Sequence, residues 1–246
     1  MGDELAQIAD WRKNVSELVA DCRDRWGLRI GEPYVPGACG HVVRVELEDG
    51  RPAVLKVFWP HREAEQEADA LERCEPGSFL SDAPDPVGVL IELLPRLWQD
   101  GEGFRTLEAE TELWTESMRE APDRRFHDVA LGYIGDLAPT QGEQVLVNQD
   151  LHGENVLAAQ REPWLVIDPK PLAGEREFSV ASIVRASELG HGKRYVLNRL
   201  DRLCAELSLD RERAKGWTIA QTVAWSGGSD FIDTHMETVR WLLEAA

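Results

Sequence analysis

The chain carries the sequence NQDLHGEN at residues 148–155 and the sequence VIDPK at residues 166–170. Asp150 is followed five residues later by Asn155, and Asp168 comes after a segment about as long as one hairpin. These three side chains are either ordinary turn residues or a set that holds a metal ion and a hydroxyl group together. The rest of the sequence decides between the two interpretations.

The composition is that of a globular protein. Of 246 residues, 43% are apolar and 29% are charged, and the net charge is -18. A chain without a basic stripe cannot neutralise the phosphate backbone of a nucleic acid, so we expect no nucleic-acid partner. The negative charge suits a cationic small molecule, although excess negative charge also simply keeps a protein soluble. The N-terminal sequence is acidic and no apolar run could span a membrane, so we expect a cytoplasmic location and no membrane partner. The four cysteines form no CxxC pair, which predicts reduced thiols rather than a zinc site.

The hydrophobic pattern divides the chain into two parts. Apolar residues recur every three or four positions up to Trp26, which predicts a helix, and two β-branched runs at 41–47 and 52–59 predict a hairpin across Asp49 and Gly50. Beyond about residue 90 the spacing is mostly helical, apart from strands predicted at 144–147, 155–159 and 164–167. We therefore expect an α+β chain with a small β-rich part, residues 1–76, and a larger helical part, residues 77–246.

A lysine lies in the middle of the second predicted strand. Side chains alternate across a strand, so Val54, Lys56 and Phe58 share one face. A lysine on an apolar strand needs a partner, which Glu63 or Glu67 in the following helical segment could supply. The alternative is an edge lysine that extends its ammonium group into water.

These residue types suit phosphoryl transfer. That reaction needs an acceptor for the alcohol proton, oxygen ligands for magnesium, and cations at the phosphates. Asp150 could take the proton, while Asn155 and Asp168 offer the hard oxygen atoms that Mg²⁺ prefers. Lys56 could hold the outer phosphates, and a glycine loop at 37–40 would let the backbone approach them closely.

The order of these features resembles the two-lobed, protein-kinase-like fold of the aminoglycoside phosphotransferase superfamily. Four stretches narrow the resemblance to the streptomycin 6-phosphotransferase and hydroxyurea phosphotransferase family: QDLHGENVLAA, PWLVIDPKPLAGEREF, LAPTQGEQVL and LERCEPG. A single D-x-x-x-x-N match is common by chance. The ordered series of glycine loop, strand lysine, helix glutamate, Asp-Asn loop and later Asp is specific.

The resemblance implies a role for each matching residue. Asp150 is the catalytic residue that orients the acceptor hydroxyl and takes its proton, and Asn155 and Asp168 bind Mg²⁺. ATP is implied to contact a larger set, made of the phosphate loop with Gly37 and Gly40, Lys56 with its partner Glu67, the adenine-facing Val54, and a hinge that includes Arg73 and Cys74.

Two features depart from the family pattern. The catalytic loop usually begins with His, whereas this chain has Asn148. Between the helix and the hinge, a kinase N-lobe has two further strands, on the order of 15–25 residues with their turns, but here the segment ending at Leu71 runs straight into the hinge. Either the N-lobe is shortened or a loop is left out of the sequence.

The resemblance implies an ATP-dependent O-phosphotransferase that acts on a cationic aminoglycoside, such as the 6-hydroxyl of streptomycin, and so gives antibiotic resistance. Other acceptors are hydroxyurea, an amino sugar or another metabolite. A nucleotide-binding pseudokinase without turnover is the non-enzymatic alternative, which Asn148 and the short N-lobe favour and the intact Asp150, Asn155 and Asp168 oppose. Candidate acidic ligands for a cationic acceptor are Glu175, Glu177, Glu188, Asp230 and Asp233.

Overall fold

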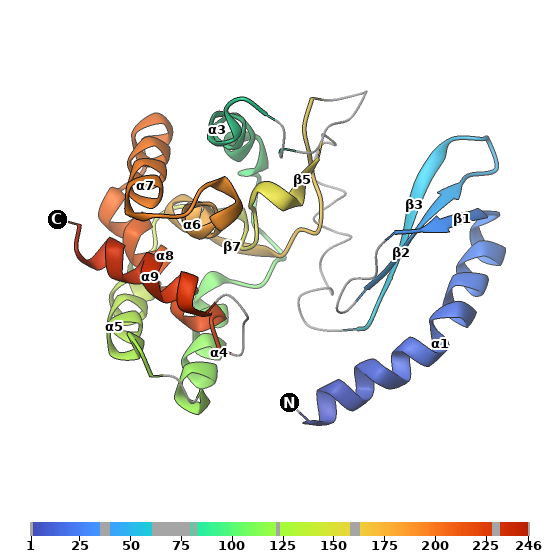
Figure 1. Cartoon of the computed structure of the whole chain (residues 1–246), viewed down its shortest axis with the longest axis horizontal. Coiled ribbons are helices and arrows are strands. Elements are labelled where there is room, and N and C mark those ends of the chain that lie inside the picture. Colours follow the sequence, from blue (N-terminus) through green and yellow to red (C-terminus); the bar gives the residue numbers. More distant parts are fainter. Residues whose placement is uncertain are drawn as a thin grey trace. The chain divides into compact units, whose positions relative to one another are not determined.

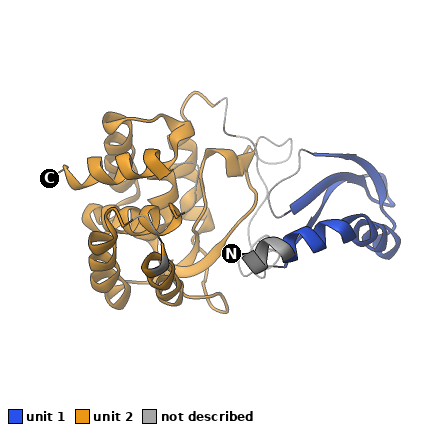
Figure 2. Cartoon of the chain, turned by 60° about the horizontal axis from the view of Figure 1, so that its bottom comes forward, with its two compact units in different colours: residues 1–65 blue, residues 66–246 orange. Residues whose placement is uncertain are grey.

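The computed structural model describes residues 2–34, 40–60, 80, 83–121, 124–157, 163–227 and 232–245. They fall into two compact units, Met1–Glu65 and Gln66–Ala246 (Figure 2). The first contains the small sheet and the second is mostly helical, as the two-lobe prediction requires. The expected boundary at residue 76 lies outside the described residues and stays a prediction.

The first unit is a helix followed by a three-stranded antiparallel sheet (Figure 1). Its elements are α1 (Gly2–Trp26), β1 (Arg29–Pro33), β2 (Gly40–Glu46) and β3 (Pro52–Phe58). The predicted hairpin forms, and Gly50 takes the positive φ of 82° that its turn requires. One face of the sheet, with Val43, Val45 and Leu55, forms a small core to which α1 contributes Val19 and Cys22.

The second unit is built around α8, whose residues from Ala214 to Val223 are all buried. Around it pack α4 (Leu107–Glu120), α5 (His127–Leu137), α6 (Ala181–Arg185), α7 (Lys193–Leu207) and α9 (Ile232–Leu243), and α3 (Pro86–Leu97) lies against α7 (Figure 1). Asp210 caps α8 (Arg211–Trp225) by accepting from the backbone N–H groups of Glu212 and Arg213. In the described part of the chain, no helix has the length and apolar character needed to span a bilayer.

The strands of this unit form two separate pairs. β4 (Gln144–Asn148) pairs with β7 (Pro171–Glu175), and β5 (Val156–Leu157) pairs with β6 (Leu165–Val166), all antiparallel. The sequence did not predict β7, because PLAGE contains poor strand formers. Every residue of β7 is buried, so pairing with β4 and tertiary packing override its weak propensity. The strand predicted at 164–167 is shorter than expected, since β6 has two residues; of the strand predicted at 155–159, β5 covers Val156–Leu157, and residues 158–159 lie outside the described ranges.

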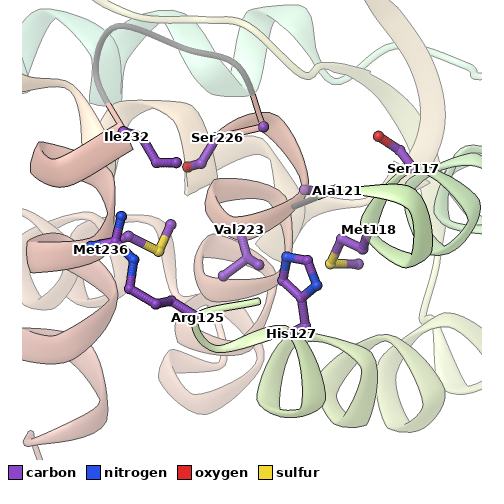
Figure 3. A pocket seen from close by; sticks show the side chains of 11 residues that line it. Ser117, Met118, Ala121, Arg125, His127, Val223, Ser226, Ile232 and Met236 are labelled. Atoms are coloured by element: carbon purple, nitrogen blue, oxygen red, sulfur yellow. The ribbon is translucent and has the colours of Figure 1, made fainter. Parts of the chain in front are cut away.

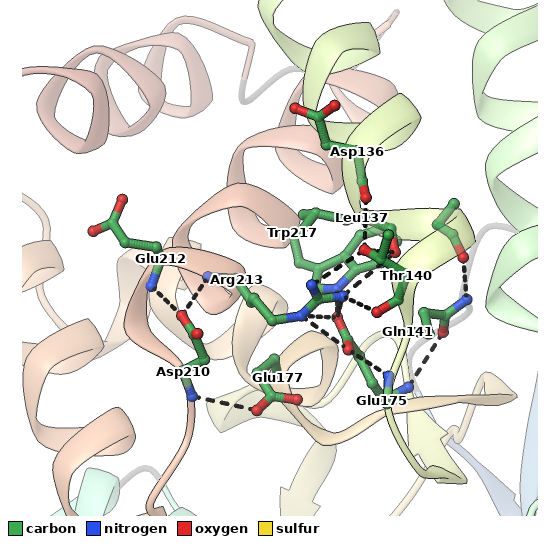
Figure 4. Close-up of polar contacts among 12 residues, drawn as sticks. Asp136, Leu137, Thr140, Gln141, Glu175, Glu177, Asp210, Glu212, Arg213 and Trp217 are labelled. Carbon is green, nitrogen blue, oxygen red and sulfur yellow. Dashed lines mark hydrogen bonds and ion pairs between the residues drawn. The ribbon is translucent and has the colours of Figure 1, made fainter.

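A buried ion pair joins β7 to α8 (Figure 4). Glu175, which is 2% exposed, accepts hydrogen bonds from the Arg213 guanidinium at 2.8 Å, from the Trp217 indole and from the Gly142 backbone N–H. Arg213 also donates to the carbonyl of Thr140 at 3.1 Å, beyond the C-terminal end of α5. Because these contacts occupy its carboxylate inside the protein, Glu175 is removed from the candidate ligands of a cationic acceptor.

Candidate active site

Two loops that are distant in sequence are bonded to each other at both ends. The N–H of Gln149 donates to the carbonyl of Lys170, and the N–H of Ile167 donates to the carbonyl of Asn155, each at 3.0 Å. The β4–β7 pairing, with Asn148 opposite Pro171, sets the first contact, and the β5–β6 pairing sets the second. The fold therefore brings the Asp150–Asn155 loop alongside the segment that contains Asp168.

Two cationic side chains and a histidine surround the carboxylate of Asp150. Its Oδ2 accepts a hydrogen bond from Lys170 Nζ at 2.7 Å. Its Oδ1 lies 3.7 Å from a terminal nitrogen of Arg185 and 3.9 Å from Nε2 of His152. The Asp150 side chain is 15% exposed, so a reactant can still reach it.

The amide group of Asn155 has a defined orientation. Its Nδ2 donates to the backbone carbonyl of Asp150 at 2.9 Å, which assigns the nitrogen to the interior of the loop. The amide oxygen is then the atom that remains for a cation. Asn155 ends a single 3₁₀ turn over Gly153–Asn155, directly before β5.

Asp168 has a left-handed backbone conformation, with φ of 50°. Non-glycine residues rarely adopt this conformation, and it is retained most often where function requires a particular side-chain position. Asp168 follows β6 by two residues, next to the segment that is bonded to Asn155.

The donor set of Asn155 and Asp168 fits Mg²⁺ bound together with a nucleotide. Mg²⁺ usually takes one or two protein carboxylates or carbonyls and completes its shell with phosphate and water. Within the described ranges, no group of three or more His, Cys, Asp or Glu side chains could hold a metal by itself. Two protein ligands therefore suit a metal ion that is bound together with ATP, and they do not form a site in which the protein supplies every ligand.

A second carboxylate, Glu188, contacts the Asp150–Asn155 loop. Its Oε1 accepts from the Gly153 backbone N–H at 2.9 Å and lies 3.2 Å from Nδ1 of His152. Burial lowers the pKa of His152, but the hydrogen bond with Glu188 and the nearby carboxylates of Asp150, Glu188 and Glu154 outweigh burial, so this pKa is raised overall. A Cβ added at Gly153 would lie 3.0 Å from Leu189 Cδ2 and 3.2 Å from Glu188 Oε1, so both side chains would have to shift by a few tenths of an ångström.

The sequence did not assign either Glu188 or Arg185 to the catalytic loop. Both come from the segment after β7, which has no periodic pattern or motif that would have identified them. Burial lowers the pKa of Arg185 to about 10, an effect that the carboxylates of Asp150 and Glu188 partly oppose, so its guanidinium remains charged at neutral pH. Arg199 holds the Glu188 segment by donating to the carbonyls of Leu189 and Gly190 at 2.8 and 2.7 Å.

The described nucleotide-site candidates of the first unit lie on its hairpin. Lys56 in β3 is opposite Val42, and its Nζ lies 5.7 Å from the centre of the Phe58 ring on the same face. Val54 lies on that face and is 56% exposed, and Gly40, the first residue of β2, is opposite Phe58 of β3. The other four predicted residues, Gly37, Glu67, Arg73 and Cys74, lie outside the described residues, as does the segment after Leu71.

A small pocket lies at another place in the second unit (Figure 3). Its walls include Met118 of α4, Val223 of α8 and Met236 of α9. At its rim, Arg125 lies 3.2 Å from the carboxylate of Asp233. Asp150, Asn155 and Asp168 do not line it, and its apolar walls suit packing better than binding of a cation.

The sequence between residues 71 and 229 matches the family model of aminoglycoside/hydroxyurea antibiotic resistance kinases. The chain belongs to this family. Streptomycin 6-kinase of Streptomyces griseus is 32% identical over 86% of this chain and 81% of its own length. Hydroxyurea phosphotransferase of Kitasatospora aureofaciens is 34% identical over 83% of this chain and 70% of its own length.

Family membership makes the chain a small-molecule kinase that uses an alcohol group as acceptor. Its fold is also that of solved kinases. A structure of the choline kinase LicA of Streptococcus pneumoniae, in complex with AMP, aligns with a TM-score of 0.64 at 11% identity and covers 94% of this chain and 98% of that one. The predicted kinase-like fold is confirmed.

Proposed function

We propose that this family member transfers the terminal phosphate of ATP to a hydroxyl group of an aminoglycoside, with the 6-hydroxyl of streptomycin as the first candidate. The observation that carries the proposal is the Asp150 carboxylate. It is partly exposed, it is held by Lys170 at 2.7 Å, and it lies on a loop bonded to the segment of Asp168. The identity with streptomycin 6-kinase supports the choice of acceptor.

In this mechanism Asp150 accepts a hydrogen bond from the acceptor hydroxyl and orients its oxygen toward the terminal phosphate. It takes the proton as the oxygen–phosphorus bond forms and the bond between the terminal phosphorus and the leaving ADP breaks. Asn155 and Asp168 would hold Mg²⁺, which supplies positive charge to the phosphates when it is bound. Lys56, with Glu67 as its partner, would hold the α- and β-phosphates. Gly37 and Gly40 would line the phosphates, Val54 would cover the adenine, and the hinge with Arg73 and Cys74 would bind its edge. Most of the rate enhancement then comes from positioning and from charge stabilisation.

The acidic surface provides ligands for a cationic acceptor. Glu188 is the best placed of the described candidates, because it contacts the loop that carries Asp150. Glu177 is half-buried and accepts a hydrogen bond from the Asp210 N–H, and the exposed Asp233 pairs with Arg125, so neither contacts the Asp150 loop in the way that Glu188 does. Hydroxyurea is a second candidate acceptor, which the identity with hydroxyurea phosphotransferase favours.

A phosphate-transfer screen tests the proposal. The protein with ATP and Mg²⁺ would be offered streptomycin, other aminoglycosides, amino sugars and hydroxyurea, and phosphorylated products would be detected by mass spectrometry. We expect phosphorylated streptomycin with the unmodified protein and far less with the Asp150→Asn variant. If hydroxyurea were the only compound phosphorylated, it would replace streptomycin as the proposed acceptor. ATP binding without product from any acceptor would instead indicate a pseudokinase.

A further inference from the structure

We propose that Lys170 is a positioning residue that aims the Asp150 carboxylate at the acceptor, and that Trp225 is the platform that holds Lys170 in place. This inference rests on the proposed function, in which Asp150 orients the acceptor hydroxyl. A solvent-exposed lysine without a role is the alternative explanation of a lysine two residues after Asp168.

The backbone of Lys170 is fixed on both sides. Its N–H donates to Oδ1 of Asn148, and its carbonyl accepts from the N–H of Gln149, each at 3.0 Å. Its side chain is only 23% exposed. A lysine that served only to remain in water would not need a fixed backbone or a largely buried stem.

The ammonium group of Lys170 makes two directional contacts. It donates to Oδ2 of Asp150 at 2.7 Å and lies 5.2 Å from the centre of the Trp225 ring. The guanidinium of Arg185 lies 4.7 Å from the centre of the same ring. An indole face attracts cations, and the attraction grows when the cations are removed from water. Trp225, in the last turn of α8, thus fixes both cations that flank Asp150.

The two oxygens of Asp150 differ in their contacts. Oδ2 has a hydrogen bond at 2.7 Å, whereas Oδ1 lies 3.7 Å from Arg185 and 3.9 Å from His152, beyond hydrogen-bond distance. Lys170 therefore occupies one oxygen and leaves the other to accept a hydrogen bond from a hydroxyl group. The direction of the carboxylate, and with it the position of the acceptor oxygen, is set by the Lys170 contact.

Steady-state kinetics of Lys170 variants test this arrangement. In Lys170→Met we expect kcat to fall about 100-fold, with the KM values for ATP and acceptor changed by less than about three-fold, because orientation is lost while binding remains. Lys170→Arg should have a kcat at least about ten-fold higher than that of Lys170→Met, because a cation again reaches Oδ2 of Asp150. Lys193→Met is the matched control, because Lys193 pairs with Glu244 on the surface, and it should keep full activity.

A second series tests the platform. Trp225→Leu should lower kcat less than Lys170→Met, and the double variant should be no slower than Lys170→Met alone, because both substitutions disturb one contact. A kcat for Lys170→Met within two-fold of the unmodified protein would overturn the proposal. So would a raised KM for ATP at unchanged kcat, which would make Lys170 a nucleotide ligand.

Urea unfolding without ligands separates this inference from the proposed function. The cycle consists of the unmodified protein, Asp150→Asn, Lys170→Met and the double variant. We expect the double variant to raise the unfolding equilibrium constant by a factor several-fold smaller than the product of the two single effects. If the losses of stability are coupled in a protein that phosphorylates no acceptor, the contact between Lys170 and Asp150 is supported and the proposed function is rejected. If the two losses are independent, the inference about Lys170 is overturned.

Discussion

The side-chain oxygen of Asn148 accepts a hydrogen bond from the backbone N–H of Lys170, 22 residues further along the chain, at 3.0 Å. The same oxygen accepts from the backbone N–H of Asp150, also at 3.0 Å. Asn148 is 9% exposed, so water is nearly excluded from both contacts. One amide oxygen thus joins the catalytic loop to the segment after Asp168, at the position where the family pattern has His.

Asn148→Ala should therefore destabilise the protein and lower its kcat. Two buried N–H groups lose their acceptor, which costs about 2 kcal/mol of unfolding free energy, and both Asp150 and Lys170 lose their support. Urea unfolding and kcat measure the two effects. Asn14→Ala removes an exposed bond to the carbonyl of Asp10 and should change neither quantity. If the two variants behaved alike, Asn148 would not support the loop.

Asp150→Asn should strongly slow transfer while nucleotide binding survives. The variant keeps the shape of the side chain but cannot take the hydroxyl proton, so kcat should fall by about 10²–10⁴-fold. Product formation and calorimetric titration with an ATP analogue check the two halves of this prediction. Glu154→Gln, an exposed change in the same loop, is the control. Full activity of Asp150→Asn would show that another group is the base.

Asp168→Asn should weaken nucleotide binding only when Mg²⁺ is present. A carboxylate binds Mg²⁺ far better than an amide, whereas binding in excess chelator does not involve the metal. Titrations of an ATP analogue with Mg²⁺ and with EDTA give the comparison. Asp201→Asn, which alters a surface pair with Arg211, should leave both affinities unchanged. An unaltered Mg²⁺ dependence in Asp168→Asn would exclude a ligand role.

Glu175→Gln should cost about 2–3 kcal/mol of unfolding free energy, because the buried carboxylate loses its charge-assisted hydrogen bonds from Arg213 and Trp217. Denaturant titration measures the loss. Glu143→Gln alters the exposed pair with Arg176 and should cost less than about 1 kcal/mol. Equal losses in the two variants would contradict a structural role for the buried pair.

His235 should make stability fall as the solution becomes acidic. Burial, and then the charge of Arg185, lower the pKa of His235 to about 4 from its usual 6.5. The unfolded chain therefore binds a proton between pH 6.5 and 4 that the folded protein excludes, and stability is lost as pH falls through this range. Allowing for the partial exposure of the ring, the loss attributable to His235 is about 1–2 kcal/mol.

The matched variant for this effect is His235→Gln, which cannot titrate and can still bond to the Ser226 hydroxyl that contacts His235 at 3.1 Å. Unfolding free energies at pH 7 and pH 4.5 would be compared in both proteins. The unmodified protein should lose more stability over this interval than the variant, and parallel losses would contradict the assignment.

Much of the architecture follows from local sequence. Periodic apolar residues predicted α1 and the mostly helical region beyond about residue 90, because a helix that buries one face must repeat its apolar positions every three or four residues. The Asp49–Gly50 turn predicted the β2–β3 hairpin for an equally local reason. The family, and with it the reaction class, followed from an ordered series of motifs that includes Asp150, Asn155 and Asp168.

Other features depend on contacts between distant residues. β7 has weak strand propensity and forms because β4 and the surrounding core bury it. The sequence alone left the roles of Asn148 and Lys170 open, because each side chain is defined by a partner about twenty residues away. Only the tertiary structure brought Lys170, Arg185 and Trp225 to Asp150, since their convergence depends on the packing of α6 and α8 beside two loops and not on any local pattern.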